Sequence, residues 1–251
     1  MNYTGQQLSE AYIARTAVIT AQCAFSTDLV GGQPADESGV AAYVKHHLKL
    51  EGDEATAAVK RIMAEEIGER ETTPETGELE AKLSYGINVI RRTEHGPWIG
   101  NWMVKACFKQ AASRLRIFKE IIGTKGDMAE AGQVSAVGIS LVEADHPERI
   151  YLRAAKQDKP ASTYWRKFMG RVQTPRGEKS IIHDSECADA GSRFAFQYRL
   201  LPGKLKEDDL RDICACAMIV GLGSAKALEC GKFSMPAGCT INFPNGKKAQ
   251  Q

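Results

Sequence analysis

The sequence predicts one domain with an α+β fold, and three observations indicate it. Strand-like segments lie near both ends of the chain, at residues 11–25 and 238–243. Two amphipathic helical segments, at 99–118 and 206–220, lie between them. Several short strand-like segments follow one another between residues 133 and 201. This order favours an α+β arrangement over a doubly wound parallel sheet.

The first half of the chain is expected to hold a strand, two helices and a second strand. The opening segment AYIARTAVITAQCAF alternates apolar and polar residues and is rich in Thr, Val and Ile, which is typical of a strand. The two helices have apolar residues at helical spacing, and Asp53 is placed to cap the second. An acidic, proline-containing loop at 69–80 precedes the second strand. These elements are expected at 11–25, 37–50, 53–69 and 83–92.

Residues 99–118 form the clearest helical pattern in the sequence. Its apolar side would hold Ile99, Trp102, Met103, Ala106, Cys107 and Leu115. Its polar side repeats every four residues and would hold Asn101, Lys105, Lys109 and Ser113. We therefore expect this helix to pack on the face of the main sheet and to expose a basic side.

The second half of the chain predicts a series of short strands, one helix and two closing strands. Thr174-Pro175-Arg176-Gly177 is a typical turn sequence between two of the strands. The helix at 206–220 is expected to end at Gly221. Its inward residues would be Leu210, Ile213, Cys214, Ala217 and Met218. The strands are expected at 133–143, 149–154, 168–173, 179–183, 193–201, 226–233 and 238–243.

Composition places the chain among ordinary globular proteins and excludes several classes. Of its 251 residues, 43% are apolar and 25% are charged, so the chain is neither disordered nor fibrous. No run approaches the roughly 18 apolar residues of a membrane-spanning helix, and the N-terminus lacks the layout of a signal peptide. The seven cysteines are scattered without CxxC spacing. This favours reduced thiols in a cytoplasmic protein over disulfides or a zinc site.

Charge is distributed unevenly along the chain, although the net charge is only +2. Residues 36–80 hold twelve acidic against five basic residues, whereas 96–126 and 166–199 are rich in Lys and Arg. A near-neutral protein can still present a basic groove when its acidic residues lie elsewhere. The two basic stretches therefore indicate a groove for nucleic acid, with a solvated helix face as the alternative.

Catalytic and cofactor motifs are weak throughout the sequence. His46-His47 fall in an expected helix, where their rings point about 100° apart and cannot both serve one site. The pair His183-Asp184 is equally ambiguous, because the spacing of a Ser-His-Asp triad cannot be judged without a fold. Gly221-Leu222-Gly223 follows a helix and precedes a strand, the reverse of a dinucleotide-binding loop. No cofactor or metal is therefore expected.

Three glycine-containing segments are informative as an ordered set. Leu29-Val30-Gly31-Gly32 follows the first strand, and PWIGNWMVKACFKQAASRL (97–115) leads into the basic helix. GLGSAKALECGKF (221–233) follows the last helix. Together they resemble motifs of the RAMP superfamily, the RRM-like proteins that include the backbone subunits of CRISPR effector complexes. Ala106 replaces a family glycine, and Glu229 stands where the terminal G-x-G begins, which indicates a divergent phage- or plasmid-borne relative.

The resemblance implies a ferredoxin-like or RRM-like core sheet with helices on one face, in a single domain over residues 1–251. It implies a helical insertion at about 36–80 and a loop and strand insertion at about 123–190. A nucleic-acid strand would lie along the glycine loops, with exposed aromatic residues stacking on bases. The implied binding residues are Gly31, Gly32, Asn101, Lys105, Lys109, Arg114, Trp165, Arg166, Lys167, Gly221, Gly223, Ser224 and Lys226. Further stacking candidates are Trp98, Tyr164, Trp102 and Phe168, with a core role favoured for the last two.

The function that the resemblance implies is RNA binding in an antiviral ribonucleoprotein. Copies of the chain would oligomerise head-to-tail along single-stranded CRISPR RNA or single-stranded DNA, beside other effector subunits. Two alternatives remain open. One is a RAMP-type endoribonuclease with His46 or His47 as general base, or with Asp28 or Asp36 in the first loop. The other is a phage or structural assembly protein that binds no nucleic acid.

Overall fold

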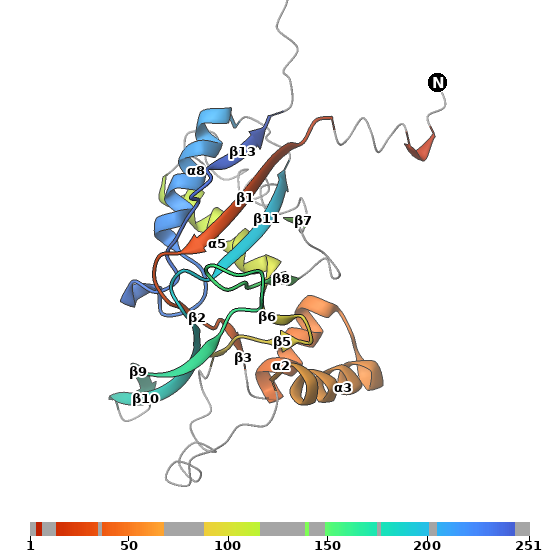
Figure 1. The fold of residues 1–251 in the computed structure, drawn as a ribbon. Helices are drawn as coiled ribbons and strands as arrows, with labels where there is room; N and C mark the ends of the chain where they lie inside the picture. The colour runs from red at the N-terminus through yellow and green to blue at the C-terminus, as the bar shows by residue number, and fades with distance from the viewer. Residues whose placement is uncertain are drawn as a thin grey trace, which may run out of the picture.

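The main sheet is antiparallel and is built from segments far apart in the sequence (Figure 1). β1 (Ala17–Phe25) pairs with β11 (Arg193–Leu200) on one side and with β12 (Phe233–Ser234) and β13 (Cys239–Asn242) on the other. β7 (Ile139–Ser140) pairs with the outer edge of β11. The computed structural model describes residues 4–6, 14–34, 37–67, 88–115, 139–140, 149–174, 177–200 and 205–243.

Chain order and strand order together define a ferredoxin-like core. α5 (Asn101–Arg114) lies between β1 and β7 in the chain, and α8 (Glu207–Val220) lies between β11 and β12. The strand order β12–β1–β11–β7 therefore interleaves two β-α-β units, with neighbouring strands antiparallel. The predicted α+β class is confirmed. The helix expected at 206–220 is also found, and it ends at Gly221.

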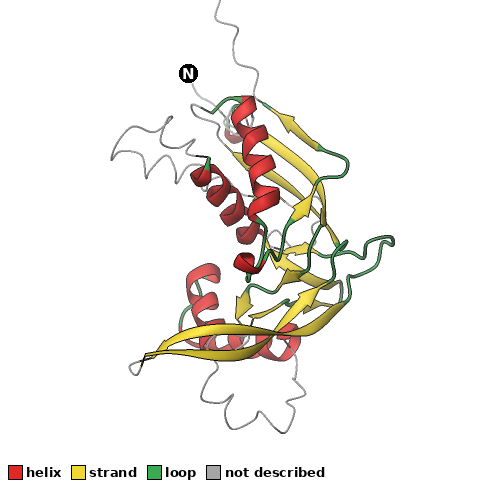
Figure 2. Ribbon diagram, turned by 90° about the vertical axis from the view of Figure 1, so that its left-hand side faces the viewer, coloured by secondary structure: helices red, strands yellow, loops and turns green. Residues whose placement is uncertain are grey.

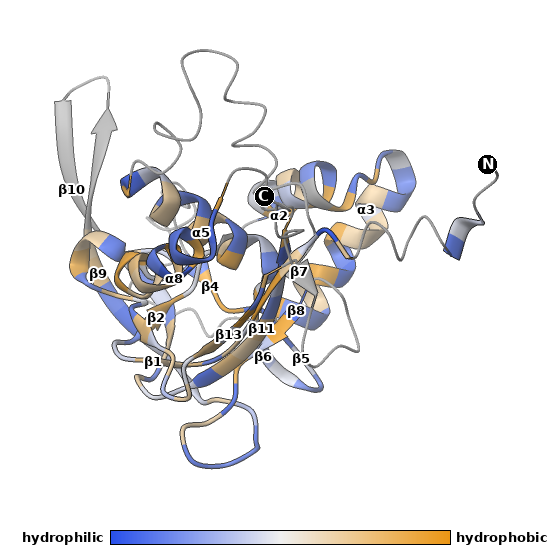
Figure 3. Ribbon diagram, turned by 90° about the horizontal axis from the view of Figure 1, so that it is seen from above, coloured by the Kyte–Doolittle hydropathy of each residue, from blue (hydrophilic) through white to orange (hydrophobic). Residues whose placement is uncertain are grey.

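Both helices pack on the same face of the main sheet (Figure 2). Every second residue of β1 is buried, so one face of this strand points into the core. Phe108 of α5 stacks on Tyr198 of β11 with ring centroids 5.2 Å apart and meets Phe196 edge-on at 5.6 Å. Figure 3 shows hydrophobic and hydrophilic stretches on both helices, as expected for amphipathic helices that cover a sheet.

The helix expected at 99–118 begins later, and its buried side agrees with the prediction only in part: Cys107 is buried, and Trp102 and Met103 are partly buried. Gly96–Gly100 forms β6, so the helix starts at Asn101. The prediction that Ala106 and Leu115 lie on the buried side is wrong, because both are exposed. Apolar residues occur around most of this helix, so only its packing against the sheet and α8 selects the buried side. The buried residues are Val104, Cys107, Phe108, Ala111 and Ala112.

A second, smaller core lies within two helical segments that follow the first strands. Each α-helix continues into a short π-helical segment. The prediction that Asp53 caps the second helix is wrong, because Glu51 is the N-cap and Asp53 lies in the first turn. The elements are α2 (Glu37–Tyr43), η1 (Val44–Leu48), α3 (Gly52–Arg61) and η2 (Ile62–Ile67). Their buried residues are Val40, Tyr43, Val44, Ala58, Val59 and Ile62.

A long β-hairpin extends away from the main sheet (Figure 1). β9 (Thr163–Thr174) and β10 (Gly177–Ala188) pair along their whole length, and β2 (Leu29–Val30) pairs with the base of β10. The strands predicted at 168–173 and 179–183 are confirmed, but each is 12 residues long. The extra length carries Tyr164 to Lys167 within a strand instead of a loop.

Short strands connect the hairpin to the helical segments. β3 (Gln33–Pro34) pairs with β4 (Asn88–Val89), and β6 lies between β5 (Arg92–Thr93) and β8 (Arg149–Tyr151). The prediction of a strand at 226–233 is wrong. The first residues of this range form a 3-10 turn, η3 (Lys226–Leu228), and only Phe233 lies in β12. Among the described residues, no helix is long and apolar enough to span a membrane.

Several predicted features lie outside the described residues. They are the acidic loop at 69–80, the first half of the strand expected at 83–92, most of the strand expected at 133–143, and Pro175 and Arg176 of the predicted turn.

Candidate nucleic-acid interface

The first glycine segment packs backbone against backbone at the base of the hairpin. The amide of Gly31 donates a hydrogen bond to the Glu186 carbonyl oxygen at 2.8 Å. A Cβ atom on Gly31 would lie 2.4 Å from the carbonyl carbon of Val89. Gly32 is exposed, and a Cβ there would lie 3.0 Å from the terminal methyl group of Met103 on α5. Position 31 therefore requires glycine, because a second backbone approaches it closely.

The C-terminal glycine segment lies directly on the first one. The Ser224 amide donates to the Val30 carbonyl oxygen at 3.1 Å, and the Ser224 hydroxyl donates to the Gly31 carbonyl oxygen. A Cβ atom on Gly223 would lie 2.2 Å from the Val30 carbonyl oxygen. Two segments 193 residues apart in the sequence are thus joined into one backbone surface. We call residues 31–32 and 221–226 the glycine junction.

The backbone of the C-terminal segment has an unusual conformation. Positive φ angles occur at Gly221, Gly223 and Gly231, and also at the non-glycine residues Ala225 and Glu229. Non-glycine residues adopt this conformation rarely, and such residues concentrate at functional sites. Alternation of left-handed and right-handed residues can turn amide groups toward an anion. Three amides of this segment, those of Gly221, Leu222 and Ser224, already donate to carbonyl oxygens of the protein. Backbone contacts with phosphate oxygens would therefore come from the other amides of the segment, such as those of Gly223 and Ala225.

Lys226 brings a cation to the glycine junction. Its Nζ donates a hydrogen bond to Oε1 of Gln110 on α5 at 3.2 Å. Burial lowers the pKa of Lys226, the neighbouring Cys107 thiol opposes this shift, and the charge of Arg114 adds to it. Arg114 lies four residues after Gln110 on α5, so it shares the side of the helix that faces the junction.

Lys105 and Lys109 lie on another flank of α5. Met103 and Gln110 mark the side that faces the glycine junction, and successive residues of an α-helix project about 100° apart. Lys105 therefore projects about 200° away from Met103, and Lys109 about 100° away from Gln110. The structure separates these two lysines from Lys226 and gives the helix two basic strips.

Asn101 is the first residue of α5, and Gly100 is its N-cap in an extended conformation. A Cβ atom on Gly100 would lie 2.3 Å from the ring of Trp102. Glycine therefore allows this ring to fold back across the start of the helix. Asn101 itself is half-buried, so the first turn of α5 is only partly accessible.

One face of the hairpin is held by Asp28. The Tyr164 hydroxyl donates to Oδ2 of Asp28 at 2.6 Å, and Arg166 forms an ion pair with the same oxygen at 3.4 Å. The amide of Ala190 donates to Oδ1 at 3.1 Å. Burial raises the pKa of Tyr164, and the hydrogen bond to Asp28 raises it further. Asp28 therefore anchors the base of the hairpin, and its oxygens are engaged where the resemblance implied a cleavage role.

The opposite face of β9 carries Trp165 and Lys167. Alternate residues of a strand point to opposite faces, so these side chains point away from Arg166. Trp165 is 49% exposed, and Lys167 is exposed as well. The register pairs Trp165 with Glu186, so the ring lies on the face of the hairpin that meets Arg92. An exposed ring beside a cation is suited to stack on an unpaired base.

Three aromatic residues considered for base stacking pack inside the protein. Trp98 is 1% exposed and Phe168 is 5% exposed. The ring of Trp102 packs against Tyr43 with centroids 5.3 Å apart. The prediction that Trp98 stacks on bases is wrong, because it lies in β6, whose residues from 97 to 100 are all buried. The core role favoured for Trp102 and Phe168 is consistent with these contacts.

The histidine and acidic candidates form no recognisable catalytic set. His46 is exposed on η1. The side chains of His47 and His183, and residue Asp36, lie outside the described part of the chain. Where the structure is described, no group of three or more His, Cys, Asp or Glu residues could hold a metal ion.

Sequence reasoning missed Glu186 of β10, which binds Ile90 and Arg92 and so holds the segment before β6 against the hairpin. Its carboxylate accepts a hydrogen bond from the Ile90 amide at 3.0 Å and pairs with Arg92. Ile90 follows Val89, so this carboxylate holds the backbone that packs on Gly31. A single glutamate within a strand gives no sequence signal of this kind, because its role depends on partners about 95 positions away.

Comparison with known proteins found similarity in structure. No family model and no curated protein matches the sequence. A chain of the Type III-B Cmr-beta cryo-EM structure bound to cognate target RNA matches with 11% identity and a TM-score of 0.38. The match covers 95% of this chain and 65% of that one. Cmr6 from Pyrococcus furiosus matches with 11% identity and a TM-score of 0.33, over 88% of this chain and 98% of that one. At these values the likeness is loose and carries no weight for function.

Proposed function

We propose that this protein binds single-stranded RNA across the glycine junction as a subunit of a ribonucleoprotein. The observation that carries the proposal is that two glycine segments from opposite ends of the chain share backbone hydrogen bonds, with Lys226 beside them. Backbone amides and a lysine hold phosphate oxygens without reading base sequence. The same segments are those that resemble RAMP motifs, and this supports RNA as the ligand.

The hairpin supplies the second part of the proposed interface. Its base lies against Gly31, and Trp165 and Lys167 extend along one exposed face. A base stacked on an aromatic ring contributes about 1–3 kcal/mol in single-strand binding, largely without regard to base identity. The proposed binding is therefore governed by phosphate charge and stacking and is tolerant of sequence.

Substitution of Lys226 tests this interface directly. Lys226→Gln removes one phosphate contact, so it should weaken binding of a single-stranded RNA for every sequence tried and reduce the salt-dependence slope by about 0.7. Fluorescence anisotropy with a labelled 30-nucleotide RNA at several salt concentrations measures both quantities. Lys156→Gln, an exposed lysine in the loop after β8, is the matched control. Equal RNA binding by the Lys226 and Lys156 variants would mean that the RNA does not contact Lys226. If the unmodified protein binds no RNA, the alternative of an assembly protein without nucleic acid is favoured.

We also propose that copies of the chain assemble head-to-tail along the strand. Acidic residues concentrate in 36–80, and the cations lie on α5, the hairpin and the glycine junction. Complementary patches at different places on one surface make heterologous contacts, which propagate instead of closing a dimer. A strand that runs through successive subunits strengthens such contacts by multivalency.

Light scattering measures this assembly. We expect the mass to rise at low salt, and to rise further when a 60-nucleotide single-stranded RNA is added. A monomer at low and at high salt, with and without the RNA, would contradict head-to-tail assembly.

A further inference from the structure

Three cysteines that are distant in the sequence come together between α8 and the edge of the main sheet. Cys23 lies in β1, Cys214 in α8, and Cys239 at the start of β13. β13 pairs with β1 in a register that sets Cys239 opposite Ala21, on the core side of the sheet. Cys23 and Cys214 are buried in the main core, and the half-buried Cys239 packs against it. None of the three belongs to the proposed RNA interface.

Within this cluster, the register and the helix packing select one pair of thiols. α8 packs on β13, and a hydrogen bond joins the Cys214 and Cys239 side chains. Cys23 lies two residues from the position opposite Cys239, and such diagonal positions in an antiparallel sheet are about 7–8 Å apart. A disulfide usually spans a Cα separation of about 4.4–6.8 Å. The register therefore favours Cys214 over Cys23 as the partner of Cys239.

The two thiols of this pair differ in their access to solvent. Cys214 is 3% exposed, and burial raises its pKa, so this thiol keeps its proton and is shielded from oxidants in solution. Cys239 is half-buried and directly follows the exposed turn residue Gly238. Among the described residues, no atom lies within 4 Å of the position that a Cβ of Gly238 would take, so the turn has room to adjust. Cys239 is therefore the thiol that an oxidant reaches first.

We propose that Cys214 and Cys239 form a reversible disulfide when the protein is exposed to a peroxide. In the first step, the Cys239 sulfur attacks one oxygen of hydrogen peroxide, the O–O bond breaks, and a sulfenic acid and one water form. In the second step, the Cys214 sulfur attacks the Cys239 sulfur, the S–O bond breaks, and the hydroxyl group leaves with the Cys214 proton as a second water. The two thiols lose two electrons and two protons, and the peroxide takes them up. A dithiol reductant reverses the oxidation by thiol–disulfide exchange.

The disulfide would fasten the last described strand of the sheet to the helix that covers it. It closes the chain segment between α8 and β13, which contains residues 221–226 of the glycine junction. Closing such a segment restricts the unfolded chain and so favours the folded one. The melting temperature of the oxidised protein should therefore lie about 5–10 °C above that of the reduced protein.

Thiol labelling and peptide mapping of the full chain test the proposal. All seven cysteines are free thiols in the structure, so each should be labelled when the untreated protein is unfolded. After treatment with hydrogen peroxide, we expect two fewer labelled thiols and, without reductant, a link between the peptides that hold Cys214 and Cys239. Dithiothreitol should restore the full labelling.

Three variants assign the link to its residues. Cys239→Ser at the sheet edge and Cys214→Ala in the core should each abolish the link and the rise in melting temperature. Cys216→Ser is the matched control, because Cys216 is a half-buried cysteine of the same helix, and this variant should form the link as the unmodified protein does. Full labelling after peroxide treatment, or a link that persists in Cys239→Ser, would overturn the proposal. Loss of one labelled thiol without a link would also overturn it, because Cys239 would then be oxidised without reacting with Cys214.

Discussion

Replacement of Gly223 by alanine tests whether the glycine junction is a close backbone contact. Gly223 has a φ angle of +76°, and a Cβ there would lie 2.2 Å from the Val30 carbonyl oxygen and 2.8 Å from Cδ1 of Leu29. The carbonyl belongs to β2, which is paired with β10 and cannot move aside easily. We expect Gly223→Ala to lower the free energy of unfolding by about 2–5 kcal/mol. Of this, about 1–2 kcal/mol is the left-handed backbone cost and about 1–3 kcal/mol is overpacking.

Gly238→Ala is the matched control for the backbone cost. Gly238 has a φ angle of +73°, but no atom lies within 4 Å of the position of its Cβ. The control should therefore be destabilised by only about 1–2 kcal/mol. The difference between the two variants isolates the contact with Val30 and should amount to about 1–3 kcal/mol.

Urea denaturation followed by tryptophan fluorescence measures both variants. If the slope of the unfolding free energy with urea is unchanged, the difference in midpoint reports stability alone. In a thermal melt, each 1 kcal/mol should correspond to about 2–4 °C for a domain of this size. Equal destabilisation by Gly223→Ala and Gly238→Ala would refute the close approach of the two glycine segments.

Two further predictions concern α5. The double variant Lys105→Ala, Lys109→Ala should weaken single-stranded RNA binding equally for different sequences, and each phosphate that is no longer neutralised should lower the salt-dependence slope by about 0.7, measured by anisotropy. Unchanged RNA binding by the double variant would show that Lys105 and Lys109 form only a solvated helix face. Burial raises the pKa of the Cys107 thiol to about 12, so the folded chain keeps a proton that the unfolded chain releases above its ordinary value of 9.0. This contribution to stability is complete below about pH 9 and is lost as the pH rises toward about 12. The urea midpoint of the unmodified protein should therefore decrease when the pH is raised from about 8 to about 10.5. The decrease should be smaller in Cys107→Ala. An equal decrease in both proteins would contradict a contribution of the buried Cys107 thiol to this pH dependence.

The elements that the sequence predicted well are those with one buried face. β1 alternates with a period of two, and α8 keeps its apolar residues on one side, so each pattern shows both the element and its inward face. α5 was predicted as a helix, but its buried side was predicted only in part, because apolar residues surround most of it. The strand expected at 226–233 failed because positive φ angles at Ala225 and Glu229 turn the backbone, and nothing in these residue types predicts that.

The candidate site was predicted as three segments and not as a surface. The glycine segments could be found from their order in the chain, since glycine marks close backbone approach wherever it is required. Three relations are visible only in the structure. Gly223 lies against Val30, Lys226 donates a hydrogen bond to Gln110, and Lys105 projects from another side of α5. Each depends on the packing of α5 between segments that are distant in sequence.

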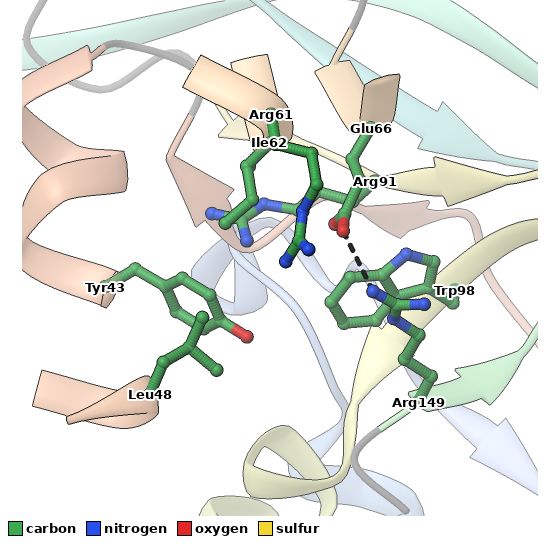
Figure 4. Close-up of a pocket in the computed structure, with 8 residues that line it drawn as sticks. All are labelled: Tyr43, Leu48, Arg61, Ile62, Glu66, Arg91, Trp98 and Arg149. Carbon is green, nitrogen blue, oxygen red and sulfur yellow. Dashed lines mark hydrogen bonds and ion pairs between the residues drawn. The ribbon is translucent and has the colours of Figure 1, made fainter. Parts of the chain in front are cut away.

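The sequence by itself determined the α+β class, the identity of most helices and strands, and the glycine segments, because these follow from local periodicity and local backbone preference. Tertiary structure alone decided the ferredoxin-like strand order, the glycine junction and the cavity that Arg61, Arg91 and Arg149 line. Arg61 is in α3, Arg149 is in β8, and Arg91 lies between β4 and β5. None of the three has a sequence context that sets it apart from a surface cation. Folding brings them together at one cavity with Glu66 (Figure 4), because burial depends on neighbours that chain order does not reveal.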